Sequence, residues 1–307
     1  MIVADLSLPA LRATLGGEGL RLCTGPLVTC IRSGESALAA GIARQYADFP
    51  LAPADGFVDF HVAIERPRLL RRWWRPQAFF WFDGQSLFLP LPAAQAFPLL
   101  EWGMNWCVSS HCHQYLIIHA AVVERHGLAL ILPAPPGSGK STLCAALVNS
   151  GWRLLSDELA LIDPATGMLQ PLPRPVSLKN ASIDIIQSFA PKAIFNPPVF
   201  ETIKGTVAHM RPPADSVRRA NETARPRWLV LPRFVAGSAT ALTPLSKAQG
   251  LMQLAENAFN YSAHGRAGFL ALGQLIDSVD CYRFEYSRLE EAMACFDALA
   301  DAAGKSP

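Results

Sequence analysis

Residues 134–142 read Ala-Pro-Pro-Gly-Ser-Gly-Lys-Ser-Thr, and this stretch constrains the chain more than any other. It has the spacing of a phosphate-binding loop, with Ala134 where a glycine more often stands. The apolar run 128–132 before it predicts a buried strand, and residues 140–150 after it predict a helix that ends at Gly151. The motif binds phosphate in this strand–loop–helix context. We therefore expect an α/β fold with a site for a nucleoside polyphosphate.

The residues of the loop have separate expected roles. Gly137 and Gly139 allow consecutive backbone N–H groups to turn inward and surround an anion. Lys140 adds a positive charge for the β- and γ-phosphates, and the Ser141 hydroxyl is placed to ligate Mg²⁺. The alternative is an ordinary glycine-rich turn before a helix, which the flanking segments disfavour. The expected nucleotide-binding residues are Pro136, Gly137, Ser138, Gly139, Lys140, Ser141 and Thr142.

Two further segments bring polar side chains toward this loop. Residues 115–123 predict a strand that pairs with the strand before the loop, and they carry His119. Residues 153–163 predict an apolar strand interrupted by Asp157 and Glu158. Because neighbouring strand residues point to opposite faces, we expect only one carboxylate to face the γ-phosphate. One would hold Mg²⁺, and the other would accept a proton from an attacking hydroxyl. A structural core histidine and surface carboxylates at a strand end are the alternatives.

Length and composition set the broader expectations. A chain of 307 residues favours two domains. We place a smaller N-terminal α/β domain, a candidate for binding substrate or a partner, at 1–112 and the domain with the phosphate loop at 113–307. The net charge of +2 gives no indication of nucleic acid or a membrane surface as partner. No apolar run approaches the ~20 residues that span a bilayer. The seven cysteines contain no CxxC pair, which is typical of reduced thiols, so we expect a cytoplasmic protein.

Apolar periodicity predicts the other secondary-structure elements. Strands are expected at 20–23, 27–31, 58–64, 228–231 and 282–286, a hairpin at 78–82 and 86–89, and helices at 35–46, 93–111, 251–261, 267–278 and 289–302.

His119, the phosphate loop and the Asp157-Glu158 pair together resemble HPr kinase/phosphorylase. His119 lies 21 residues before Lys140, which is the interval of that family's histidine. Glu158 lies 17 residues after the loop serine, where the family has its catalytic aspartate. Residues 204–207, Lys-Gly-Thr-Val, resemble the Arg-Gly core of the family's signature segment. The first 110 residues do not resemble its regulatory domain, so HPr itself is not implied as the acceptor.

The whole chain looks more like the proteins called HPr-related kinase A. The runs that carry this likeness are YADFPLA, LPAPPGSGKSTLCAAL, LLSDEL, PRPVSLKNASID, KGTVAHMRPPADSV and ENAFNY. These proteins are similar to kinases that phosphorylate a serine of lasso-peptide precursors, and they are associated with PqqD-type peptide-binding partners. The resemblance implies the HPr-kinase variant of the phosphate-loop fold, which PEP carboxykinase shares in outline.

The resemblance also implies a function and a set of site residues. We expect an ATP- and Mg²⁺-dependent kinase that transfers the γ-phosphoryl group to a hydroxyl group of a peptide or small protein. Serine is the expected acceptor residue. A homo-oligomer and a PqqD-type partner are compatible with it. The alternatives are a non-catalytic nucleotide-sensing module and a small-molecule kinase. The expected catalytic residues are His119, Lys140, Asp157 and Glu158.

The expected metal and substrate contacts combine the residue pattern with this resemblance. Thr202 stands where the family signature carries its Mg²⁺-binding glutamate, so the adjacent Glu201 is expected to substitute for it. The expected metal ligands are therefore Ser141, Asp157 and Glu201. No residue clearly matches the family's catalytic arginine. The cations expected to contact substrate or phosphate are Arg174, Lys179, Lys204, Arg211 and Lys247.

Overall fold

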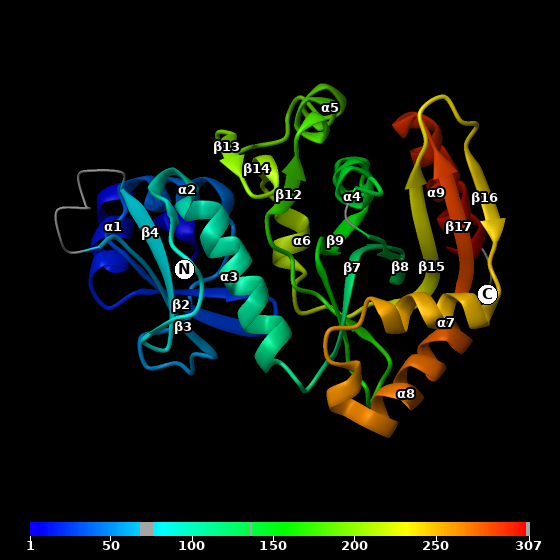
Figure 1. The fold of residues 1–307 in the computed structure, drawn as a ribbon, viewed down its shortest axis with the longest axis horizontal. Helices are drawn as coiled ribbons and strands as arrows, with labels where there is room; N and C mark the ends of the chain where they lie inside the picture. The colour runs from blue at the N-terminus through cyan, green and yellow to red at the C-terminus, as the bar shows by residue number, and fades with distance from the viewer. Residues whose placement is uncertain (68–75, 136, 305–307) are drawn as a thin grey trace.

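Two large sheets, each with its own helices, form the body of the fold (Figure 1). The computed structural model describes residues 1–67, 76–135 and 137–304, so Pro136 of the expected phosphate loop lies outside the described residues. The chain completes the first sheet before it enters the second, and the change comes between α3 (Ala96–His111) and β7 (Leu116–Arg125). The α/β class expected from the sequence is confirmed.

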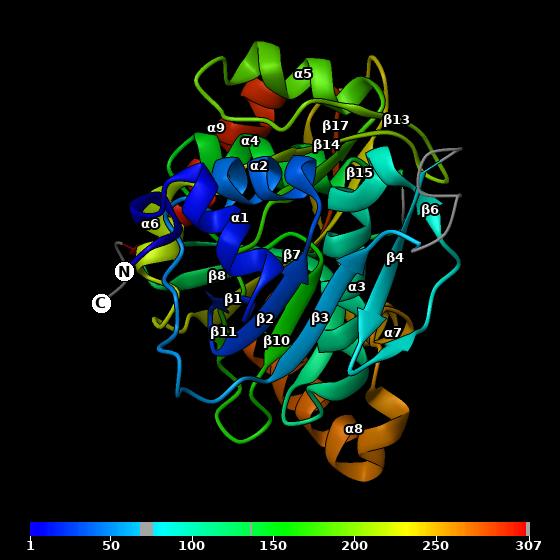
Figure 2. The same ribbon diagram turned by 90° about the vertical axis from the view of Figure 1, so that its left-hand side faces the viewer.

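The first sheet has the strand order β1-β2-β3-β4-β5, and β6 pairs with β4. Figure 2 faces this sheet and shows β1 to β4 side by side. Three helices pack on one face, where Ile31, Ile64 and Phe80 are fully buried. The elements are η1 (Val3–Asp5), α1 (Leu8–Gly16), β1 (Leu20–Thr24), β2 (Leu27–Ser33), α2 (Ser36–Gln45), β3 (Phe60–Glu65), β4 (Gln77–Phe82), β5 (Gln85–Ser86), β6 (Leu91–Pro92), η3 (Ala93–Gln95) and α3.

The hairpin after β4 is shorter than the sequence predicts. β5 pairs with β4 only through Trp81↔Ser86 and Phe82↔Gln85, and it ends at Ser86. Pro90 has no N–H group with which to continue a ladder. The strand β6 pairs instead with the start of β4, so the expected strand at 86–89 is wrong beyond Ser86.

The second sheet has the order β11-β10-β7-β8-β15-β17-β16, and β9 also pairs with β7. Side chains alternate between its two faces. Ala121 and Val123 pack toward α4 and α9, whereas Ile118 and Ala120 pack toward α7 and α8. The elements are β8 (Leu128–Pro133), α4 (Lys140–Asn149), β9 (Arg153–Ser156), β10 (Leu159–Ile162), β11 (Leu169–Gln170), β15 (Arg225–Phe234), β16 (Ala241–Pro244), α7 (Lys247–Glu256), α8 (Tyr261–Ser278), β17 (Asp280–Tyr286) and α9 (Leu289–Gly304).

A smaller sheet lies beside α4 and has the order β12-β14-β13 (Figure 1). All of its neighbouring strands are antiparallel. The elements of this region are β12 (Val176–Lys179), α5 (Ala181–Phe189), β13 (Val199–Thr202), β14 (Gly205–Met210) and α6 (Ala214–Arg218). Contacts between α4 and both β12 and α5 place this region beside α4.

The helix expected at 251–261 is wrong in both bounds. The Ser246 side chain accepts a hydrogen bond from the Gln249 N–H, which caps α7 and lets it begin at Lys247. The helix stops at Glu256 because the next residues bond to β7 instead. The carbonyl of Asn257 accepts the His119 N–H at 2.7 Å. Periodicity within the segment carries no information about this tertiary pairing.

The first sheet is not isolated from the second. Its hydrophobic core also contains Ile117 of β7, Leu159 and Leu161 of β10, and Leu172. The helix α3 lies between the two parts (Figure 1). None of the helices that the structure describes is long and apolar enough to cross a bilayer.

Candidate functional site

The expected phosphate loop connects β8 to α4 with the backbone geometry that the motif requires. Gly137 and Gly139 have φ angles of 87° and 88°, in the left-handed region that favours glycine. The Ser138 N–H donates to the Pro135 carbonyl at 3.3 Å, and the Leu143 N–H donates to the Gly139 carbonyl at 2.9 Å. The loop therefore leads directly into α4, whose N-terminal N–H groups are free to bind an anion.

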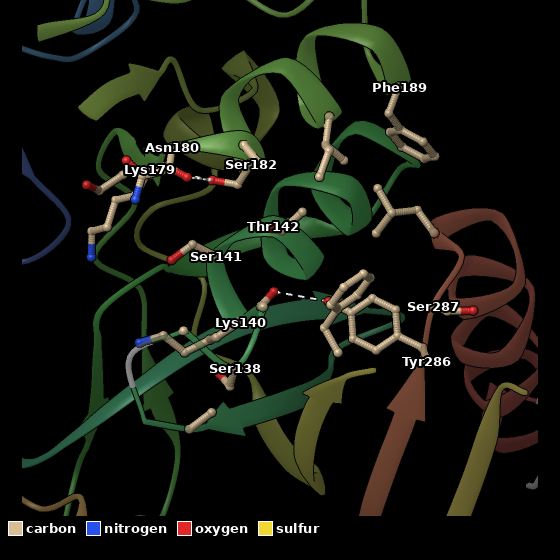
Figure 3. A pocket seen from close by; sticks show the side chains of 18 of the residues that line it. Ser138, Lys140, Ser141, Thr142, Lys179, Asn180, Ser182, Phe189, Tyr286 and Ser287 are labelled. Atoms are coloured by element: carbon tan, nitrogen blue, oxygen red, sulfur yellow. Dashed lines mark hydrogen bonds between the residues drawn. The ribbon is translucent and has the colours of Figure 1, made fainter. Parts of the chain in front are cut away.

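Two residues that the sequence did not single out, Phe234 and Tyr286, hydrogen-bond to the loop backbone. The strands β8, β15 and β17 are parallel, so their carboxyl ends meet at one edge of the sheet. Phe234 ends β15, and its N–H donates to the Ser138 carbonyl at 3.1 Å. Tyr286 ends β17, and its hydroxyl donates to the Gly139 carbonyl at 3.2 Å (Figure 3). Tyr286 could have been found from the sequence only by its position at the end of a predicted strand.

Gly139→Ala is expected to destabilise the loop more than Gly137→Ala. Both changes put a side chain at a positive φ, which costs about 1–3 kcal/mol. Only at Gly139 would the new Cβ also come within 2.6 Å of the Tyr286 hydroxyl, whereas a Cβ at Gly137 meets no described atom within 4 Å. Melting temperatures of the two variants measure the difference. Adding Tyr286→Phe should recover part of the loss at Gly139 and none at Gly137; equal losses without recovery would contradict this packing.

His119 lies directly beside the loop lysine. The register of β7 with β8 pairs Ala120 with Pro133, so His119 is level with the end of β8, where the loop begins. Its Nε2 atom is 3.1 Å from the Lys140 Nζ atom. Burial, together with the nearby charge of Lys140, lowers the pKa of His119 to about 4. The imidazole is therefore neutral at pH 7 and accepts a hydrogen bond from the ammonium group, which has only donors.

Glu158 lies next to His119 and Lys140 because of the register between β10 and β7. β10 pairs with β7 through Leu159↔His119, and the Ala120 N–H donates to the Glu158 carbonyl at 3.2 Å. The carboxylate accepts a hydrogen bond from Asn105 Nδ2 at 3.2 Å. Burial raises the pKa of Glu158, but the charges of Lys140 and two further lysines outweigh it and hold the pKa below its usual range. The side chain is thus a carboxylate at neutral pH.

Asp157 occupies a different environment from its neighbour. It is 5% exposed, and its Oδ2 atom accepts the Ser177 N–H at 3.1 Å. Burial raises the pKa of Asp157 to about 6, although the charge of Lys140 lowers it. No described residue is a hydrogen-bond partner of its buried Oδ1 atom. A buried oxygen without a partner is costly unless it binds something.

A cavity of about 1010 Å³ lies over the loop (Figure 3). This volume is at the upper end of the range for small-molecule and cofactor sites. Lys179 lies at one end of the cavity, and Phe189 of α5 and Tyr286 lie at the other (Figure 3). His119 and Glu158 also line the cavity, and the charge of Lys179 lowers the pKa of both groups. Glu158 lines this cavity and Asp157 does not, which agrees with the expected opposite orientation of neighbouring side chains. The loop residues line it from Gly137 to Thr142.

Two of the five cations expected to contact substrate lie near Glu158. Lys179 ends β12 and lines the cavity. Lys204 lies in the turn between β13 and β14, and its Nζ atom is 4.9 Å from the centre of the Trp102 ring. The positive charges of both lysines lower the pKa of Glu158.

The other three expected cations are bound elsewhere and do not line the cavity. Arg174 is buried and pairs with Glu101 at 2.7 Å. Arg211 pairs with Asp48. The Lys247 ammonium donates to backbone carbonyls at the end of α8, including that of Ile276 at 2.8 Å. Each charge is satisfied by groups far away in sequence, which the local pattern does not reveal.

The expected metal ligands are only partly brought together. Ser141 is the second residue of α4, and its hydroxyl contributes to lowering the pKa of Asp157. Glu201 is exposed, has a φ of 55°, and does not line the cavity. Its backbone carbonyl accepts a hydrogen bond from Gln95 at 3.1 Å. The described ranges contain no group of three His, Cys, Asp or Glu side chains that could hold a metal.

A scan against models of protein families finds no match to this chain, and a search of curated proteins finds no similar sequence.

Proposed function

We propose that the protein is an ATP- and Mg²⁺-dependent kinase that phosphorylates a hydroxyl group of a peptide or small protein. Serine is the residue that we expect to carry this hydroxyl. One observation carries the proposal: His119, Lys140 and Glu158 converge at one end of the cavity over the phosphate loop. Lys140 provides a cation and the ionised Glu158 provides a base at the place where the γ-phosphate is expected. The neutral His119 is the hydrogen-bond partner of the lysine. The resemblance to HPr-related kinase A supports the same reading and favours a cytoplasmic peptide carried by a PqqD-type partner.

The residues at the loop fit a nucleotide with one Mg²⁺. The inward-turning loop and the N-terminus of α4 provide N–H donors for phosphates. Mg²⁺ in such sites takes one or two protein oxygens and completes its shell with phosphates and water. Ser141 and the unpartnered Oδ1 atom of Asp157 would supply the protein oxygens. When bound, Mg²⁺ would neutralise charge on the β- and γ-phosphates.

Each of these side chains then has a separate role in phosphoryl transfer. His119 holds the Lys140 ammonium against the phosphates through its Nε2 atom. Lys179 and Lys204 add positive charge, in place of the arginine that the resemblance leaves unmatched. Glu158 accepts the proton of the acceptor hydroxyl while the hydroxyl oxygen bonds to the γ-phosphorus and the bond to the β-phosphate oxygen breaks.

Exposed apolar side chains near this end of the cavity favour a peptide over a small molecule. Phe259 is 52% exposed, and its ring centre is 5.9 Å from that of His119. Ile203, next to Lys204, is 81% exposed, and Phe200 on the same hairpin is 67% exposed. Apolar side chains gathered at the surface around a site are typical of contacts with another chain.

The test is transfer of label from [γ-³²P]ATP, with Mg²⁺, to candidate precursor peptides encoded beside the protein. We expect label on a peptide serine, located by mass spectrometry and absent without Mg²⁺. Label that enters only the low-mass fraction of a cell extract would replace the proposal with a small-molecule kinase. Tight ATP binding without transfer to any acceptor and without release of phosphate would indicate a nucleotide-sensing module.

A further inference from the structure

A continuous chain of hydrogen bonds leads from the first sheet's helices to Glu158. The Tyr46 hydroxyl at the end of α2 donates to Glu101 Oε1 at 2.5 Å. Arg174 Nη2 donates to Glu101 Oε2 at 2.7 Å, and Arg174 Nη1 donates to Asn105 Oδ1 at 2.8 Å. Asn105 Nδ2 then donates to Glu158 Oε2 at 3.2 Å. Every link joins segments that are at least 53 residues apart in the sequence.

The members of this chain are held by burial and by helix geometry. Tyr46, Glu101 and Arg174 are 0%, 4% and 7% exposed. Glu101 and Asn105 are one helical turn apart and therefore share a face of α3. Arg174 also donates to the Glu101 backbone carbonyl at 2.9 Å, so its guanidinium is fixed to α3 at two acceptors. A buried ion pair of this kind constrains position more than it adds stability.

The guanidinium determines which way the Asn105 amide faces. Arginine has only donors, so the amide atom that faces Arg174 must be the oxygen. The amide nitrogen is then forced toward Glu158 and donates to its carboxylate. No hydrogen bond to the other carboxylate oxygen, Oε1, occurs among residues 1–67, 76–135 and 137–304. That oxygen remains available to an acceptor hydroxyl in the cavity that Glu158 lines.

We propose that Asn105 is a positioning residue for Glu158, so that α3, a helix of the first sheet, completes the catalytic site. The inference rests on the proposed function, in which Glu158 accepts the hydroxyl proton. Asn105 fixes the rotamer of the carboxylate, and Arg174 fixes Asn105. The part before residue 112 thus acts in the chemistry and is more than a site for partner binding.

The alternative is that the contact only ties α3 to the second sheet. A double-mutant cycle on the full chain separates the two, with Asn105→Ala and Glu158→Gln made singly and together. We expect Asn105→Ala to lower kcat by about 10- to 100-fold, as misplacement of a reacting group does, with KM for ATP little changed. In the Glu158→Gln background, Asn105→Ala should lower kcat no further, because the group it positions is already lost.

Two more variants keep the test decisive. Asn105→Asp keeps the acceptor for Arg174 and nearly the same shape, but it faces Glu158 with a second carboxylate, so kcat should fall even if Asn105→Ala folds poorly. Ser109→Ala is the control, because the one hydrogen bond of the Ser109 hydroxyl to a residue that the structure describes goes to the Trp106 carbonyl of the same helix, at 3.2 Å; its kcat should equal that of the wild type.

The outcomes distinguish this inference from the proposed function. A wild-type protein that transfers phosphate, with Asn105 variants that keep its kcat, would overturn the positioning role alone. Additive losses in the cycle would also overturn it, because a merely structural contact lowers activity in either background. A wild-type protein that transfers no phosphate would overturn the kinase proposal, and the positioning role would fall with it.

Discussion

Glu158→Gln is expected to lower the rate of phosphoryl transfer by about 10²–10⁴-fold, which is the usual cost of removing a general base. The substitution keeps the shape of the side chain and removes the negative charge. Because lysine charges hold the pKa of Glu158 below its usual range, the wild-type side chain is ionised at neutral pH and ready to accept a proton. Single-turnover transfer to the acceptor peptide measures this rate without a contribution from product release.

The nucleotide affinity of Glu158→Gln should show whether the substitution affects phosphoryl transfer alone or also disrupts the nucleotide site. Glu158→Gln removes a negative charge near Lys140 and Lys204, so the affinity for the ATP anion should be unchanged or slightly higher. Isothermal titration with MgATP checks this. Glu18→Gln, at an exposed position in the first part of the chain, is the matched control and should change neither quantity. An unchanged transfer rate in Glu158→Gln would show that another group takes the proton.

The elements around the phosphate loop could be predicted from the sequence because their information is local. The apolar run, the glycines and the helix that follows are contiguous, and β8 and α4 lie where the pattern predicts them. The structure also brings His119 and Glu158 beside the loop lysine: His119 lies on β7, which pairs with β8, and Glu158 directly precedes β10, which pairs with β7. Pairing of strands that are consecutive in the chain, such as β7 and β8, is common, which makes the position of His119 accessible from sequence.

The remaining parts of the site depend on contacts between distant segments. Tyr286 meets the loop 147 residues after Gly139, because β17 is parallel to β15 at the same edge of the sheet. Asn105 reaches Glu158 from a helix that the sequence assigned to a separate domain. No local periodicity encodes either contact.

Charged residues that were expected to contact a ligand show the same limit of prediction from sequence. Arg174 and Arg211 lie in proline-rich segments, and each is paired with a carboxylate from the first 101 residues. Glu201 lies one position before the place of the signature glutamate, and the irregularity in β13 leaves it exposed. A charge becomes available to a ligand only when the fold leaves it without a closer partner.

Lys140→Ala is expected to abolish the stabilisation that MgATP gives to the wild-type protein. A ligand at 100 times its dissociation constant raises the free energy of unfolding by about 2.7 kcal/mol. Lys140 is 8% exposed at the start of α4 and carries the charge nearest to the expected γ-phosphate. Its removal also deprives Asp157 of the main charge that lowers the pKa of this carboxyl group. The pKa of Asp157 should therefore rise further, and the protonated acid is a poor ligand for Mg²⁺.

Melting curves with and without MgATP measure both effects of this substitution. The wild type should show a higher melting temperature with MgATP, and Lys140→Ala should show the same melting temperature in both conditions. Transfer should fall by at least about 10²–10³-fold, the cost of losing one preorganised group that stabilises transition-state charge. Lys192→Ala, an exposed lysine that does not line the cavity, is the control and should keep the full shift. A normal shift and normal transfer in Lys140→Ala would mean that residues 134–142 are not the phosphate site, because no arrangement of that loop binds the β- and γ-phosphates without close approach to its lysine.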